Sequence, residues 1–381
     1  MKIDRIETFL VPPRWLFCRV ETDEGLVGWG EPVVEGRAEV VRAAVEVLSE
    51  YLLGEDPLRI EQHWQVLSKG GFYRGGPVLS SAVAGIDQAL WDIAGQAYGA
   101  PVHALLGGPV RDRVRVYSWI GGDEPGELAD AAAAQVEAGM TAVKMNASGL
   151  LGPIPSAAEV SAVVRRVGSV RQVLGDERDV AVDFHGRASA AAARRILPEL
   201  APLRPLFVEE PVLPEHQQQL AGIVAASPVP IATGERLFAR HEFLAPLRAG
   251  VAVVQPDLSH AGGISEVRRI AAQAETYGAV LAPHCPLGPI SLAASLQVAF
   301  ATPNFLIQEQ SIGIHYHSGS ELLDYVLDRE PFRFVDGHLR RPEAPGLGIT
   351  VDEPAVRAAA RTGHAWRNPV WQHADGSFAE W

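Results

Sequence analysis

The chain has 381 residues, too many for one small domain and enough for one barrel-sized domain plus a smaller one, since single α/β barrels need roughly 250 residues. Its 33 basic and 46 acidic side chains give a formal net charge of −13, which disfavours nucleic acid and anionic membrane surfaces as partners. Cys18 and Cys285 are the only cysteines, which is too few for a disulfide framework. The N-terminal residues do not form the apolar run of a signal peptide. Both observations lead us to expect a cytoplasmic protein.

The first hundred or so residues have the pattern of a mixed α and β region. We expect strands over residues 2–11, 16–22 and 26–31, then helices over residues 38–53, 57–67 and 80–98. A glycine-rich loop, residues 70–77, lies between the last two helices and carries Phe72, Tyr73 and Arg74 at its centre. Such a loop is a candidate for a mobile lid, although a plain connector is an equally good interpretation.

From Arg113 onward, short apolar strands alternate with longer alanine-rich stretches of helical character, the alternation of a parallel α/β structure. The expected strands cover residues 114–120, 141–146, 180–185, 206–210, 229–234, 251–256, 280–284 and 305–308. This number favours a closed barrel over an open doubly wound sheet, which would also carry a glycine-rich phosphate loop. Residues 276–308 lack charged side chains, but their prolines argue against a membrane helix. From about Pro331 the chain is expected to return to the N-terminal region.

Polar residues stand at or just beyond the ends of these strands: Lys144, Asp183, Glu209, Glu235, Asp257, His284 and Glu309. From Asp183 the successive intervals are 26, 26, 22, 27 and 25 residues, each about one strand, loop and helix. In a barrel such residues converge at the rim of the C-terminal mouth. One acidic residue at a strand end is more often a helix cap or a solvated side chain, by roughly four to one. Six in register would be costly to bury unless a metal or a substrate compensates them.

Three carboxylates of this set, Asp183, Glu209 and Glu235, lie on three adjacent predicted strands. Oxygen ligands without a thiolate suit a hard cation such as Mg²⁺ better than they suit zinc. We therefore predict a magnesium site at the barrel mouth.

Two histidines are expected beside this metal site. Side chains alternate between the two faces of a strand, so His185, two residues after Asp183, is expected on the same face of the strand as that carboxylate. His284 follows the strand next to that of Asp257, close enough for the carboxylate to orient the imidazole and raise its basicity. For either histidine alone, loop stabilisation would be the default interpretation by roughly two to one. Beside three carboxylates, the catalytic interpretation is favoured.

Seven motifs carry a family resemblance, at residues 143–146, 183–187, 208–211, 233–236, 255–264, 282–289 and 308–310. Together they resemble the enolase superfamily, in particular the sugar-acid dehydratases of its mandelate racemase subgroup, and the similarity runs from Pro12 to Trp381. The resemblance implies a modified TIM barrel, (β/α)7β, beneath an α+β capping domain made from both chain ends. The predicted boundaries are 1–112 for the N-terminal capping domain, 113–330 for the barrel and 331–381 for the returning segment.

The resemblance also implies a chemistry for these residues. Mg²⁺ would be bound by the three carboxylates, His284 backed by Asp257 would take the C2 proton of a small sugar acid, and His185, as an imidazolium, would protonate the departing 3-hydroxyl. Glu309 would stabilise the enediolate. The implied substrate-binding residues are Lys144, Asn146, Arg14 and Tyr73. A homo-oligomer is also implied, an octamer among the expected assemblies.

Asn146 favours elimination over racemisation. Racemases of the family carry Lys-x-Lys on the second barrel strand and so have a base on each face of the substrate, whereas this chain has Lys144-Met-Asn146. The apolar segment at residues 147–158 leaves the identity of the sugar acid open. A dehydratase, racemase or epimerase for another sugar acid is the alternative, and a non-catalytic scaffold would have a broken metal triad or no base.

Overall fold

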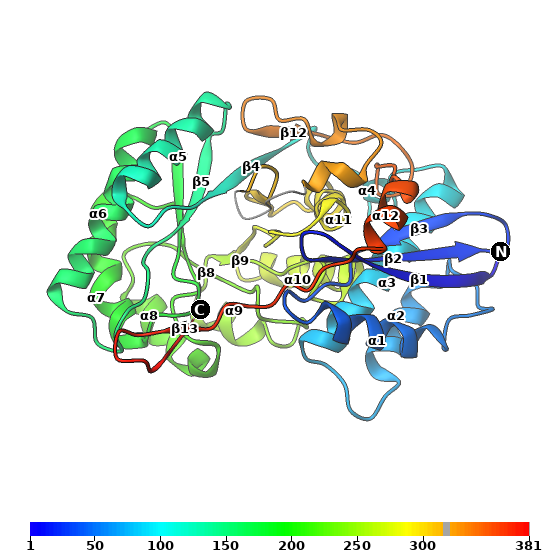
Figure 1. Ribbon diagram of the computed structural model, residues 1–381, viewed down its shortest axis with the longest axis horizontal. Coiled ribbons are helices and arrows are strands. Elements are labelled where there is room, and N and C mark those ends of the chain that lie inside the picture. The colour runs from blue at the N-terminus through cyan, green and yellow to red at the C-terminus, as the bar shows by residue number, and fades with distance from the viewer. Residues whose placement is uncertain (315–320, 381) are drawn as a thin grey trace.

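The computed structural model describes residues 1–314 and 321–380, which form a barrel and a smaller capping part beside it (Figure 1). The capping part contains a three-stranded antiparallel sheet with the order β1 (Ile3–Val11), β2 (Trp15–Thr22), β3 (Val27–Gly30). The N-terminal helices beside it are α1 (Ala38–Ser49), α2 (Ile60–Lys69), α3 (Pro77–Tyr98) and α4 (Val102–Leu105). Pro77 at the start of α3 and Gly99 in the left-handed conformation at its end are the residues that helix boundaries prefer.

Eight strands form the barrel, in the order β10, β9, β8, β7, β6, β5, β4, β11, all paired in parallel. A parallel bridge between Leu281 and Phe305 closes the ring. The strands are β4 (Arg113–Ile120), β5 (Ala142–Asn146), β6 (Asp179–Asp183), β7 (Val208–Glu209), β8 (Ile231–Thr233), β9 (Val253–Val254), β10 (Val280–Leu281) and β11 (Gln308–Gln310). The predicted (β/α)7β architecture is confirmed.

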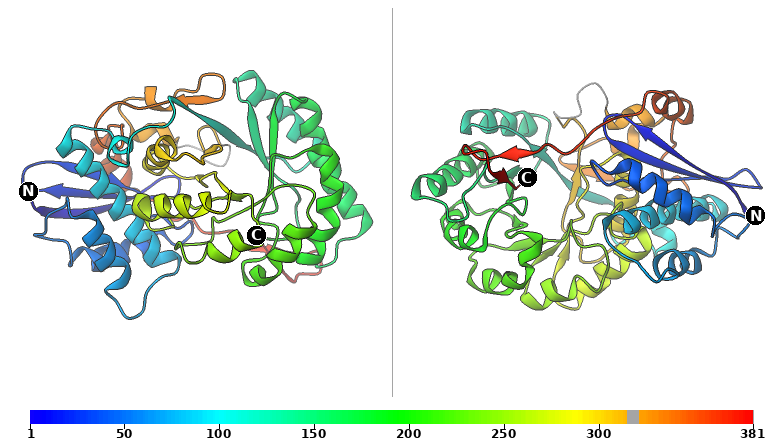
Figure 2. Two further views of the ribbon diagram at one scale, coloured as in Figure 1. Left: turned by 180° about the vertical axis from the view of Figure 1, so that it is seen from behind. Right: turned by 60° about the horizontal axis from the view of Figure 1, so that its bottom comes forward.

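One α-helix follows each barrel strand except the last, and these helices form the outer layer of the barrel (Figures 1 and 2). They are α5 (Pro125–Glu137), α6 (Ala157–Leu174), α7 (Ala190–Leu200), α8 (Leu220–Ala226), α9 (Leu244–Ala249), α10 (Gly263–Glu275) and α11 (Pro289–Ala301). Among the described residues, no helix combines the length and apolar character needed to cross a membrane.

A layer of buried side chains fills the barrel below the strand ends. Each strand, or the residue next to it, contributes one member: Tyr117, Ala142, Ala181, Phe207, Ala232, Val253, Ala282 and Ile307. The rings of Tyr117 and Phe207 meet edge to face, with centroids 6.5 Å apart. This packed layer forms a floor, so that polar groups at the C-terminal strand ends face the mouth.

The predicted barrel strands differ from the observed ones at one or both ends, and two of these errors concern His185 and Glu309. The third barrel strand was expected to reach His185, but β6 ends at Asp183, and His185 has a φ of +56°. The last strand was expected over residues 305–308, but β11 covers Gln308–Gln310, so Glu309 lies within the strand. Both errors concern the point where an apolar run gives way to the polar residues of the site.

The capping part is fastened to the barrel through Glu31, a buried carboxyl that follows β3. Its two oxygens accept the backbone N–H groups of Gly288, at 2.7 Å, and of Ser291, at 3.0 Å, at the start of α11. A Cβ atom at position 288 would lie 2.7 Å from a Glu31 oxygen, so only glycine allows this approach. Glu31 thus satisfies the free donors of a helix that belongs to the barrel.

The segment after residue 331 contacts both parts of the molecule. Strand β12 (His338–Arg340) pairs antiparallel with β4 of the barrel, whereas α12 (Glu353–Ala360) packs against β1 of the capping sheet. The last described residues then cross back to the barrel and end in a small hairpin of β13 (Trp371–Gln372) and β14 (Phe378–Ala379) (Figures 1 and 2). The domain boundaries expected at residues 112 and 331 stay predictions.

Candidate active site

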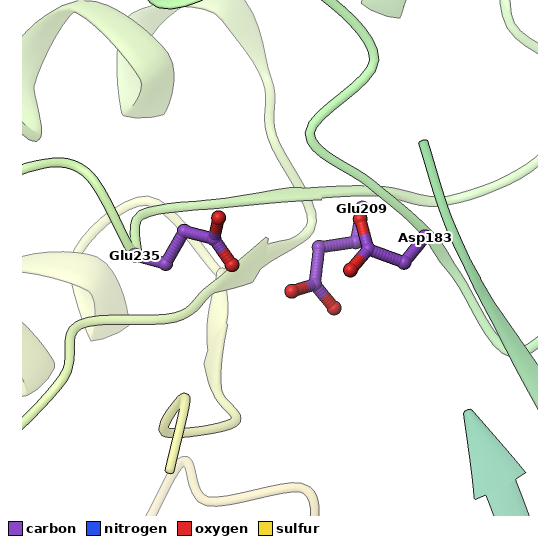
Figure 3. A group of neighbouring side chains, drawn as sticks. All are labelled: Asp183, Glu209 and Glu235. Carbon is purple, nitrogen blue, oxygen red and sulfur yellow. The ribbon is translucent and has the colours of Figure 1, made fainter. Parts of the chain in front are cut away.

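Asp183, Glu209 and Glu235 bring their carboxyl groups together at the C-terminal ends of β6, β7 and β8. One oxygen from each lies within 4.8 Å of the others, and Figure 3 shows the three groups converging on one small volume. Burial raises the pKa of all three carboxyls, in each case to about 7. Buried carboxylates in such proximity are stable only beside positive charge, so the donor set fits a hard divalent cation such as Mg²⁺.

Lys144, on β5, supplies positive charge at one side of this triad. Its ammonium lies 2.9 Å from Glu209, 2.7 Å from Glu309 and 4.0 Å from Asp183. Burial alone would lower the pKa of Lys144, but the carboxylates of Glu209 and Glu309 outweigh burial and hold the pKa well above its ordinary value. In this arrangement the lysine is a buried cation that partly compensates the negative charge of the triad.

The loop that carries Glu235 is held by the neighbouring carboxylate Glu210. Glu210 accepts hydrogen bonds from the Thr233 hydroxyl at 2.6 Å, the Gly234 N–H at 3.0 Å and the Arg236 guanidinium at 2.7 Å. Glu210, which has a φ of +46°, directs its side chain to the loop after β8, whereas the carboxylate of Glu209 lies beside Lys144. Two consecutive residues therefore have different roles: Glu209 is a candidate metal ligand, and Glu210 holds the loop that carries Glu235.

His284 and Asp257 form the expected pair. The Nδ1 atom of His284 lies 2.8 Å from a carboxylate oxygen of Asp257, and its Nε2 atom lies 3.3 Å from Glu235. Burial lowers the pKa of His284, but the surrounding carboxylates, Glu235 first, outweigh burial and raise the pKa to about 10. A cation bound between Glu235 and its partners would cancel much of that field, which would bring the imidazole towards the neutral form that a base requires.

His185 reaches the site from a turn after β6. Its backbone N–H donates to the Asp183 carboxylate at 2.5 Å, and its Nδ1 atom accepts a hydrogen bond from the Arg187 guanidinium at 2.8 Å. Burial and the positive charge of Arg187 lower the pKa of His185 well below its ordinary value. The neighbouring guanidinium thus opposes the imidazolium expected from the sequence, whose role as a proton donor stays a prediction. With Arg187 donating to Nδ1, the hydrogen of a neutral ring lies on Nε2.

The structure brings most of the other predicted residues to the mouth. Glu309 accepts the Cys285 N–H at 2.8 Å, and Asn146 has a buried side-chain oxygen that makes no hydrogen bond within the described part of the chain. Arg14 reaches over from the capping part, and its guanidinium donates to the Pro286 carbonyl at 3.2 Å. Tyr73 lies on the glycine-rich loop and is 88% exposed, and its part in substrate binding stays a prediction.

Sequence reasoning missed a second buried histidine next to the pair. His260 lies with Nε2 3.8 Å from Asp257 and 3.6 Å from Glu35 of the capping part, and its Nδ1 is 3.2 Å from the Ser81 hydroxyl. Gln255 was also missed, although its amide donates to Glu209 at 2.8 Å. Both residues lie in the same motif as Asp257, so their closeness in sequence to that carboxylate was the available signal.

Two family models match the chain over its two parts. The model described as Enolase C-terminal domain-like covers residues 127–355, and the mandelate racemase/muconate lactonizing enzyme N-terminal domain covers residues 12–107. The chain belongs to the enolase superfamily. The first match covers more than half of the sequence and contains the whole carboxylate triad, and the second contains Arg14, Glu31 and Glu35.

Similar proteins extend the match over the full length. D-galactonate dehydratase of Ralstonia nicotianae is 54% identical over 382 aligned residues and that of Pectobacterium atrosepticum is 52% identical, each with 100% of both chains covered. The crystal structure of an enolase from Agrobacterium radiobacter, bound to sodium and L-malate, is 34% identical with a TM-score of 0.91 and complete coverage of both chains. At this similarity the chain is an enzyme of the hydro-lyase class.

Proposed function

We propose that this chain catalyses the Mg²⁺-dependent dehydration of D-galactonate to 2-dehydro-3-deoxy-D-galactonate. The observation that carries the proposal is that the His284–Asp257 pair lies against the carboxylate triad. The Nε2 atom of His284 is 3.3 Å from the carboxylate of Glu235. A proton next to a carboxylate is hard to remove because a second negative charge develops, so the base must act beside fixed positive charge. The full-length similarity to D-galactonate dehydratases supports the choice of sugar acid.

Each proton in the reaction has a candidate carrier. His284 takes the C2 proton, with Asp257 holding Nδ1, and His185 gives a proton to the 3-hydroxyl as it leaves as water; the resulting enol then becomes the 2-keto acid. Bound Mg²⁺ would supply Lewis-acid stabilisation of the negative charge on the substrate carboxylate. The substrate anion would also favour the protonated form of His185, against the effect of Arg187.

A single base supports elimination over racemisation. Lys144 is occupied by Glu209 and Glu309, and Asn146 replaces the second lysine that a racemase would need on β5. The unpaired Asn146 oxygen suits a hydrogen bond from a substrate hydroxyl. Lys144 and Arg14 add positive charge for the acid end of the substrate.

The test is a panel of sugar acids incubated with the purified protein and Mg²⁺, with detection of 2-keto-3-deoxy acids. D-galactonate should be turned over with the highest kcat/KM. A preference for a different sugar acid would support the alternative, a related dehydratase, racemase or epimerase, and the absence of product from every aldonate would reject the proposal. The homo-oligomeric assembly and cytoplasmic location expected from the sequence remain part of the same proposal.

A further inference from the structure

The C-terminal tail, defined here as residues 361–380, runs along the capping part before it crosses to the barrel (Figure 2). Trp366 packs against the Arg14 guanidinium, with 5.2 Å between its central carbon and the ring centroid. The next residue, Arg367, forms an ion pair with Glu39 of α1 at 3.2 Å. The tail therefore leaves the capping part from a fixed position, beside an arginine that also contacts the loop of His284.

The far end of the tail contacts the barrel at Arg187, in the loop after β6. The guanidinium carbon of Arg187 lies 5.7 Å from the ring centroid of Trp371, a cation–π distance. The Nε atoms of both side chains are buried and make no hydrogen bond within residues 1–314 and 321–380. The cation–π contact is therefore the interaction that the structure shows between Trp371 and this arginine.

Arg187 transmits this restraint to His185. Its Nη2 atom donates to Nδ1 of the imidazole at 2.8 Å, so one guanidinium touches both the indole of the tail and the histidine of the site. An arginine side chain has many rotamers, and a stacked aromatic ring limits them. A guanidinium fixed beside Nδ1 in turn sets the rotation of the imidazole and leaves Nε2 as the nitrogen available to the substrate.

We propose that Trp371 is a positioning residue for His185, acting through Arg187. The inference rests on the proposed function, and it assigns to the tail a role in the proton donation step alone, because His284 is held independently by Asp257. Loss of Trp371 should then impair departure of the 3-hydroxyl and spare removal of the C2 proton. A tail that merely stabilised the fold would affect both steps together.

The experiment compares Trp371→Ala, Trp371→Phe and the control Phe378→Ala. Phe378 stands opposite Gln372 in the same hairpin, with 67% of its side chain exposed. In Trp371→Ala, dehydration should fall about tenfold to a hundredfold, the usual range for loss of a residue that orients a ligand, while exchange of the C2 proton with D₂O stays near the wild-type rate. Trp371→Phe should recover most of the dehydration, and Phe378→Ala should match the wild type.

Equal loss of exchange and dehydration in Trp371→Ala, or no loss of either, would overturn the proposal. Arg187→Met removes the same contact from the barrel side. The separate effects on dehydration and on C2 proton exchange can therefore be measured even if Trp371→Ala does not fold. Crystal structures of the metal-free proteins give a readout without catalysis: Arg187 should stay on His185 in the wild type and in Phe378→Ala, and leave it in Trp371→Ala. An unmoved Arg187 rejects the inference, whereas a wild type that dehydrates no sugar acid rejects the proposed function.

Discussion

His284 lies between two carboxylates that act on different ring nitrogens. Asp257 holds Nδ1, and Glu235 faces Nε2, the nitrogen left for chemistry. This arrangement makes His284 a specific test of the base. Replacing it with Asn should abolish exchange of the C2 proton with solvent deuterium, a loss of at least about a hundredfold, because general-base catalysis contributes that much or more.

Proton NMR in D₂O measures this exchange directly. His241→Asn is the matched control, since His241 is exposed on the loop between β8 and α9. Exchange that persists in the His284 variant at the wild-type rate would show that another group removes the proton.

Protons should compete with Mg²⁺ for the carboxylate triad. Burial raises the pKa of Asp183, Glu209 and Glu235 to about 7 in each case, so below this pH the carboxyls hold protons that a cation must displace. Above it they are anionic. The affinity for Mg²⁺ should therefore rise between pH 6 and pH 8, and binding should release protons.

Isothermal titration calorimetry in buffers of different ionisation enthalpy measures both quantities. A Kd that stays constant over this pH range, or proton uptake on binding, would contradict the raised pKa values.

At the scale of elements, the loop after β8 depends on a residue from the neighbouring strand end. Glu210 follows β7 and binds Thr233, Gly234 and Arg236, which flank the metal-ligand candidate Glu235. Glu210→Ala should weaken Mg²⁺ binding by about tenfold to a hundredfold, because the carboxylate of Glu235 would lose its fixed orientation. Equilibrium binding of Mg²⁺ provides the measurement.

Glu215→Ala is the control for that variant, since Glu215 is exposed and lies five residues further along, in a 3-10 helix (Pro214–Gln219) of the same connection between β7 and α8. Wild-type Mg²⁺ affinity in Glu210→Ala would mean that Glu235 is oriented by other contacts.

The strand ends show which parts of the site could be predicted from sequence. Asp183, Glu209 and Glu235 were found because each βα unit repeats at a nearly constant interval, and parallel pairing then puts equivalent positions side by side. The orientation of His185 could not be found in this way, because alternation applies only within a strand and β6 ends at Asp183. Beyond that point the turn, with its positive φ, decides where the imidazole lies.

At the scale of the whole molecule, Glu31 links the capping part to the barrel. Glu31→Ala would leave the N–H groups of Gly288 and Ser291 buried without partners. We expect a loss of about 3 kcal/mol in the free energy of unfolding, since each unsatisfied buried donor costs roughly 1–3 kcal/mol. The same variant should slow C2 exchange, because the loop from His284 to Gly288 loses an anchor.

Chemical denaturation measures the first effect, with Glu46→Ala on the exposed face of α1 as the control. Equal stability of the two variants would show that water or a neighbouring side chain replaces the Glu31 carboxyl.

The contact between Glu31 and Gly288 could not be predicted from a single sequence. Glu31 and Gly288 are separated by 257 positions, and Trp371 and Arg187 are likewise far apart in the chain. No local pattern of hydrophobicity or spacing pairs them, because the pairing depends on how the capping part sits on the barrel. The role of Tyr73 stays a prediction, because a glycine-rich loop with exposed aromatic residues fits both a lid and a plain connector.

The course of the tail has a practical consequence for handling the protein. The described chain ends against the barrel, close to the loop of His185, whereas the N-terminus lies at the outer edge of the capping part (Figure 1). An affinity tag or fluorescent fusion placed after the tail would add bulk and charge beside the hairpin that carries Trp371. Purification handles and surface-immobilisation linkers therefore belong at the N-terminus, and kinetic data from C-terminally tagged protein would mix the properties of the enzyme with those of the tag.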